Sequence, residues 1–266
     1  MCIGLFLVAM LPAVPAGAEP SLSKKQLDAV VRLEAVTIPT PGEFFVAIDK
    51  QGQPNWTQLF DPKSAAPTSS RERMALVLGI LVADGYIAVE AQNSQAVKNI
   101  GRDIINLAKK LNVSQSILGR GNSLSDFAGN NDWSALREEL EATQNEVKLA
   151  MAEQKDRDLV ILVTLGAWIR GTDVTTSFVS RNFSPQLAEL VRQPAIVQYF
   201  LDQIAELPEN TRTDPLILST QAGLSEILGI VIADPAQPLS EAAVGRLAAI
   251  TSGLVNLICD GGKQTP

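Results

Sequence analysis

The stretch LGILVADGYIAVE, residues 78–90, places one aspartate, Asp84, among apolar and small neighbours. A helix should begin ahead of it, because Ser69 and Glu72 have the spacing of a capping box before RMALVLGILVADGYIAVE. Apolar residues occupy every side of such a helix, which indicates an element buried among other helices. Because an unpaired buried charge costs several kcal/mol, the sequence predicts that Asp84 has a partner or faces a wet cavity.

A cation in a second apolar helix is the expected partner. Arg170 in LGAWIRGTDVTTS is one candidate, Arg102 is another, and Asp173 follows Arg170 by three residues on the same helix face. The favoured interpretation is that such pairs fix helix register or reach the surface. The alternative hypothesis is a polar pocket for a small ligand, lined by Asp84, Trp168, Arg170 and Asp173.

Helix signals dominate the rest of the chain and predict an all-α fold, a multi-helix bundle with nearly apolar central helices and amphipathic outer helices. No run of alternating β-branched residues is bounded by turn dipeptides. The Pro-, Gly- and Ser-rich stretches 37–68 and 119–132 are expected to be surface segments, apart from one short helix. Helices are predicted near 22–36, 42–50, 69–91, 94–111, 132–156, 158–180, 185–191, 194–206, 214–232 and 240–258, with 132–180 forming one helix or two.

Four segments are apolar on nearly all sides and are expected at the centre of the bundle: 74–89, 159–169, 216–232 and 242–258. A membrane bundle is the alternative, but the apolar runs are short and no flanking Lys/Arg asymmetry accompanies them. The small residues Gly245, Ala249 and Gly253 recur every four positions and predict close helix packing.

Two short segments resemble each other. LGILVAD at 78–84 and LGIVIAD at 228–234 are identical at five of seven positions. Asp84 continues a helix, whereas Asp234 precedes Pro235 and should end one. Coincidence is the preferred interpretation, and a duplicated helical hairpin is the alternative.

The N-terminus has the pattern of a secretory signal. Residues 1–18 contain an uncharged apolar run that ends in Ala16-Gly17-Ala18, although no Lys or Arg precedes it. A membrane anchor or a buried helix is the alternative, which Pro12 and Pro15 disfavour. We expect an exported protein, periplasmic or secreted, with a single helical domain at 19–266 and a possible minor break near 208–215.

Composition limits the chemistry. The 266 residues carry a net charge of −7 and no histidine. The acidic balance and the lack of a visible Lys/Arg cluster argue against nucleic acid and against anionic lipid as partners. Without histidine the common triads, the usual zinc sites and the commonest general base are unavailable. No cofactor and no metal site is predicted, and Cys259, alone once Cys2 leaves with the signal, should be a core residue.

The order and texture of four motifs, IPTPGEFF, LGILVADGYIAVEAQN, IGRDIINLAKKLNV and LGAWIRGTDVTTS, resemble a group of exported, all-helical bacterial envelope proteins. The resemblance covers roughly residues 38–180, implies a helical exported protein and adds no site residue. The leading expectation is therefore a non-catalytic periplasmic or secreted scaffold or binding module with a protein or small-molecule partner and no membrane span after signal removal. A small-ligand binder, or a hydrolase, that uses the Asp84–Arg170 region is the alternative.

Overall fold

The computed structural model describes residues 38, 40–52, 54–153 and 156–260, and these ranges contain helices but no strand. The predicted all-α multi-helix fold is therefore confirmed. All described residues belong to one compact unit, residues 38–266. The predicted signal at 1–18 and the predicted helix at 22–36 lie outside the described residues.

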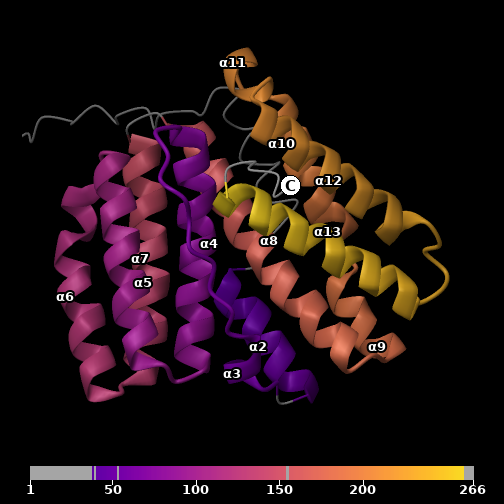
Figure 1. Ribbon diagram of the computed structural model, residues 1–266, viewed down its shortest axis with the longest axis horizontal. Helices are drawn as coiled ribbons and strands as arrows, with labels where there is room; N and C mark the ends of the chain where they lie inside the picture. Colours follow the sequence, from indigo (N-terminus) through magenta and orange to yellow (C-terminus); the bar gives the residue numbers. More distant parts are fainter. Residues whose placement is uncertain (1–37, 39, 53, 154–155, 261–266) are drawn as a thin grey trace, which may run out of the picture. The chain divides into compact units, whose positions relative to one another are not determined.

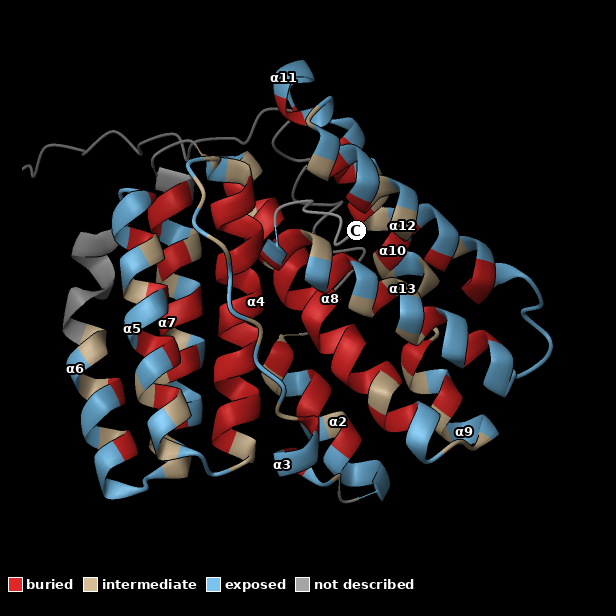
Figure 2. Cartoon of the chain, viewed as in Figure 1, coloured by how far each residue is buried: buried red, intermediate tan, exposed pale blue. Residues whose placement is uncertain are grey.

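Two helices form the centre of this unit, α4 (Arg71–Glu90) and α8 (Arg157–Arg181) (Figures 1 and 2). Both are buried along most of their length, as their apolar sequences predict. Their backbones touch where two glycines face the partner helix. A Cβ atom on Gly79 would lie 2.0 Å from the Val163 carbonyl oxygen, and one on Gly166 would lie 2.1 Å from that of Leu76. Only glycine permits this approach, because real Cβ atoms do not come so near other backbone atoms.

The N-terminus of α4 differs by one residue from the prediction. Ser70, not Ser69, is the cap: its hydroxyl accepts a hydrogen bond from the Arg73 amide at 3.1 Å and donates one to Glu72 at 2.9 Å. The helix ends at Glu90. The sequence TSSRE does not distinguish the two caps, because either of the neighbouring serines has a hydroxyl that can cap the helix.

Helices α5 (Ser94–Lys110) and α7 (Trp133–Glu153) pack against α4, and α6 (Ser114–Asn130) packs against α5 and α7 on the side away from α4 (Figure 1). The prediction of a surface loop at 119–132 is wrong, because most of this stretch is helix α6. Leu124 and Ala128 of α6 are buried, so one apolar side outweighs the weak helix propensity of its Gly, Ser and Asn residues. Asn131, at a φ of 56°, ends the helix. Helices α7 and α8 are two helices, which settles the open question at 132–180.

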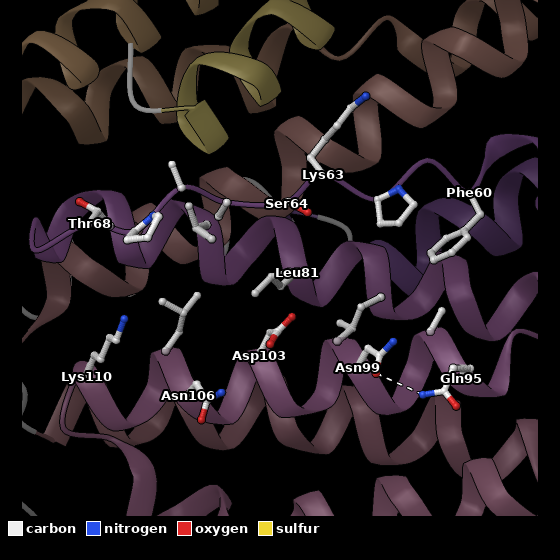
Figure 3. A pocket seen from close by; sticks show the side chains of 18 of the residues that line it. Phe60, Lys63, Ser64, Thr68, Leu81, Gln95, Asn99, Asp103, Asn106 and Lys110 are labelled. Carbon is white, nitrogen blue, oxygen red and sulfur yellow. Dashed lines mark hydrogen bonds between the residues drawn. The ribbon is translucent and has the colours of Figure 1, made fainter. Parts of the chain in front are cut away.

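The 37–68 stretch holds two short helices, α2 (Pro41–Gly52), at the predicted position, and α3 (Trp56–Leu59). Trp56 joins them, since its ring packs against Phe45 at 5.2 Å and its indole N–H donates to Asp49 at 2.9 Å. Residues 60–70 have no regular secondary structure. We call them the strap, because they run along α4 (Figure 3).

The C-terminal part contains α9 (Pro185–Ala188), the 3-10 helix η1 (Glu189–Val191), α10 (Pro194–Ala205), α11 (Glu209–Arg212), α12 (Pro215–Ile232) and α13 (Glu241–Asp260). Helices α9, α10 and α12 begin at the prolines that predict their starts. Helix α11 lies within the 208–215 segment. Cys259 is buried at the end of α13, as predicted.

The prediction that α12 and α13 are central is wrong. Each buries one side and leaves the other exposed, with Leu218 and Ile232 of α12 about half exposed (Figure 2). The close packing predicted at Gly245 and Gly253 is also absent, since an added Cβ would meet nothing within 4 Å in the described chain. By length and composition alone, α8, α12 and α13 are each apolar enough to cross a membrane, but α8 is mostly buried inside the fold.

Candidate functional site

Asp84, Arg170 and Asp173 form a buried ion network between the two central helices. The Arg170 guanidinium donates from Nε to Asp84 Oδ1 at 2.7 Å and from Nη1 to Asp173 Oδ2 at 2.5 Å. All three side chains are almost fully buried, and Asp84 has no exposed surface. The predicted pairing of Asp84 with Arg170 is therefore observed, whereas Arg102 is exposed and donates to Asn99.

One cation serves two carboxyl groups in this network. Burial raises the pKa of Asp84 and of Asp173, and the attraction of Arg170 offsets only part of that effect. Asp84 Oδ2 is buried without a hydrogen-bond partner among the described residues. Because removing either charge would leave the other buried and uncompensated, the network is expected to hold α4 and α8 in register.

Trp168, the fourth predicted site residue, lies apart from this network. Its indole N–H donates to the Gln193 side chain at 2.9 Å, and its ring packs against Phe200 at 5.5 Å. Trp168 and Arg170 are two positions apart and therefore leave α8 in different directions. The structure thus brings together three of the four predicted residues. None of the four side chains lines any of four surface cavities in the described part of the chain.

The third donor of Arg170 reaches the strap. Nη2 donates to the carbonyl oxygen of Asp61 at 2.9 Å. Five residues further along, the Ala66 amide donates to the carbonyl oxygen of Cys259 at 2.9 Å. The strap is thus held at two points, by the buried network and by the last turn of α13, and then enters α4 through the Ser70 cap.

A groove of about 880 Å³ lies between the strap and α5 (Figure 3). Its α5 wall combines a row of polar side chains at helical spacing with the apolar residues Ala96, Ile100 and Leu107, and the apolar side chains of Val77 and Leu81 from α4 also line it. Lys63, Ser64 and Thr68 belong to the opposite wall. The row on α5 consists of Gln95, Asn99, Asp103, Asn106 and Lys110.

The chemistry of this wall suits binding better than bond cleavage. Carboxamides donate and accept hydrogen bonds but do not transfer protons at neutral pH. Asp103 is the one carboxylate among the described lining residues, so the pair of acids that glycoside hydrolysis needs is not assembled there. Nor does the described part of the chain contain a group of three or more His, Cys, Asp or Glu side chains placed to hold a metal ion.

Sequence reasoning missed this groove. The polar row on α5 carries a signal, because positions 95, 99, 103, 106 and 110 repeat at three or four residues and so share one face. The opposite wall carries none, because the strap is placed by contacts with Arg170 and Cys259, which lie far away in sequence.

The chain matches no protein-family model, no curated protein and no solved structure. The resemblance to exported helical envelope proteins therefore stays a prediction. Any functional conclusion depends on the strap, the α5 wall and the buried network that joins them.

Proposed function

We propose that this protein is an exported, soluble, non-catalytic binding protein whose groove holds an extended peptide segment. The observation that carries the proposal is the row of polar side chains on α5, three of them carboxamides, opposite a strap without regular secondary structure. The apolar run at residues 1–18 supports export.

The dimensions of the α5 wall suit a short extended peptide. From Gln95 to Lys110 the helix rises about 22 Å, at about 1.5 Å per residue. A strand that rises about 3.3 Å per residue would cover this length with six or seven residues. The groove would therefore accommodate a heptapeptide.

Both walls offer groups that recognise a peptide backbone. Each carboxamide carries N–H donors and a carbonyl acceptor, which match the amide groups of an extended chain. Gln95 donates to Asn99 at 3.2 Å, and a bound peptide would replace this exposed hydrogen bond. Ser64 and Ala65 line the strap side, and their backbone groups make no hydrogen bond within the described residues. Free backbone groups on an extended segment can pair with an added strand. The apolar floor at Leu81 and Val77 would then take alternate side chains of the ligand.

The buried network has a role in this proposal. Arg170 would fix the strap at Asp61 and so keep the groove open in the absence of ligand. A pre-organised wall lowers the ordering cost of binding. In this interpretation Asp84, Arg170 and Asp173 position the site without contacting the ligand.

Selection of a random heptapeptide library on the immobilised full-length protein tests the proposal. A peptide that is enriched should bind the wild type and should bind Gln95→Ala/Asn99→Ala about tenfold more weakly, because two hydrogen-bonding groups are lost. Asn256→Ala, an exposed amide on α13 outside the groove, is the matched control and should bind normally. Failure to enrich any peptide, or equal affinity of the double variant, would contradict the proposal.

Export has a separate test. Expression of the full chain with its own N-terminus should yield a mature protein that begins at Glu19, as read by N-terminal sequencing of the extracytoplasmic fraction. An intact N-terminus in the cytoplasmic fraction would contradict export without affecting the groove.

A further inference from the structure

We propose a second binding site, for a phosphate-type oxyanion, in the hollow between α5 and α6. This hollow has a volume of about 290 Å³. It lies on the flank of α5 that faces α6, and Asn106 lines both this hollow and the peptide groove. The site is independent of what the groove binds.

Three cations of α5 lie on one side of the hollow. Lys98, Arg102 and Lys109 all line it, and no acidic side chain is among its described lining residues. The side chains opposite them on α6, Asn122 and Ser125, are neutral hydrogen-bonding groups. Amide and hydroxyl groups together with ammonium and guanidinium groups are the ligands that phosphate oxygens accept from proteins.

Several arginines of the fold have an acidic partner, whereas these three cations line one hollow without one among the described residues. Arg71, Arg120, Arg137, Arg170 and Arg192 each form an ion pair with a carboxylate, some across helices and some within one. No ion pair involves Lys98, Arg102 or Lys109 within the described part of the chain, and the recorded contact of Arg102 is with the neutral Asn99.

The spacing of the three cations has an energetic consequence. Lys98 and Arg102 are four residues apart on one helix, where like charges repel and destabilise the helix. In a chain of net charge −7, acidic residues are abundant, yet none neutralises this hollow. A bound anion would relieve the repulsion, so the arrangement favours an anionic ligand. The three residues are spread over twelve positions, 98–109, which explains why no basic cluster is visible in the linear sequence.

The space itself depends on the helix contact. Gly121 of α6 lies against Ile105 of α5, where a Cβ atom would be 2.2 Å from the isoleucine side chain. Both residues line the hollow. The Ile105 side chain therefore packs directly against the α6 backbone at Gly121, beside the α6 residues Asn122 and Ser125 that line the hollow with the cations.

Titration of the full-length protein with inorganic phosphate at constant ionic strength, followed by calorimetry, tests this site. We expect saturable binding to the wild type and at least about tenfold weaker binding to Lys98→Gln/Arg102→Gln/Lys109→Gln. The control Lys50→Gln/Arg212→Gln/Arg246→Gln removes the same charge from exposed positions elsewhere and should bind phosphate like the wild type.

Two outcomes would overturn the proposal: no saturable binding beyond that of chloride, or equal losses in both triple variants, which would indicate only a general effect of net charge. Circular dichroism confirms that each variant is folded. The groove variant Gln95→Ala, which leaves the hydrogen bond from Arg102 to Asn99 in place, should keep its phosphate affinity, so failure of the peptide proposal is distinguishable from failure of this one.

The same variants identify the source of the anion. Sedimentation with phosphatidylcholine vesicles that contain or lack phosphatidylglycerol separates a lipid headgroup from free phosphate. The site would be assigned to a lipid headgroup if the protein binds only the anionic vesicles, if phosphate competes with this binding, and if Lys98→Gln/Arg102→Gln/Lys109→Gln abolishes it. Phosphate binding without vesicle binding would assign it to the soluble anion.

Discussion

The segments LGILVAD at 78–84 and LGIVIAD at 228–234 share five residues and have opposite surroundings. In α4 the whole segment is buried, and Asp84 is neutralised by Arg170. At the end of α12 the equivalent Asp234 is exposed and accepts a hydrogen bond from the nearby Ala236 amide at 3.1 Å. Nearly equal sequences thus occupy the centre and the periphery of one fold (Figure 2).

Neighbouring helices explain the difference. Helix α4 packs against α2, α5, α7, α8 and α13, whereas α12 packs chiefly against α10 and α13. An apolar helix is therefore buried all round only where other helices surround it, and apolar composition alone does not specify that. The different settings favour coincidence over duplication of a hairpin.

Substitution of Asp84 and of Asp234 should show the largest contrast in the free energy of unfolding. Asp84→Ala should lower the free energy of unfolding by about 3–5 kcal/mol, because Arg170 is left buried without its main partner. Asp234→Ala should cost less than about 1 kcal/mol, since it loses one exposed hydrogen bond. Denaturant unfolding measures both. A stability that is unchanged or raised in Asp84→Ala would instead indicate that the charge serves ligand binding, because functional sites often cost stability.

The glycine pair should show the next contrast. Gly79→Ala forces α4 and α8 apart, because its Cβ would meet the backbone of Val163 and Ala167, and a loss of about 3 kcal/mol is expected. Gly229→Ala meets nothing within 4 Å and should gain up to about 1 kcal/mol from reduced backbone freedom in the unfolded state. Thermal unfolding should therefore shift in opposite directions. A shared direction would disprove the close helix contact.

Val82 and Ile232, the fifth residues of 78–84 and 228–234, should give the smallest contrast in stability. Val82 is 3% exposed and Ile232 is 49% exposed. Val82→Ala should cost about 2 kcal/mol through lost burial and a small cavity, whereas Ile232→Ala should stay within about 0.5 kcal/mol. Denaturant unfolding at two protein concentrations checks this. A large, concentration-dependent loss for Ile232→Ala would show that the outer side of α12 is covered by a second copy.

The ion network between the central helices was predictable in part, since a charge inside an all-round apolar helix requires a partner. Arg170 was one of two candidates, and the sequence did not decide between it and Arg102. The start of α4 was predictable to within one residue because Ser69 and Ser70 have the same capping chemistry. Whether residues 132–180 form one helix or two could not be decided from the sequence, as no glycine or proline marks a break near Asp156.

Other features depend on tertiary contacts. Helix α6 reads as a loop because Gly, Ser and Asn dominate it, and only packing of Leu124 and Ala128 makes it helical. The outer position of α12 could not be predicted from the sequence, because Leu218 and Ile232 are apolar residues of the kind that usually lie in a core. The groove and the cationic hollow arise from chain segments that meet only in the folded state, so neither could be located in advance.

The strap gives the fold an order of assembly. The Ala66 amide donates to the Cys259 carbonyl oxygen, and Arg73 donates to the Ile258 carbonyl oxygen at 2.8 Å. Residues near 60–73 can therefore complete their contacts only after α13, almost two hundred positions later, has been synthesised. The early helices can pack together while these contacts with α13 are still missing. The strap would then take its final position only in the finished polypeptide, and a C-terminally shortened chain would lack the α13 carbonyl groups that hold residues 66 and 73.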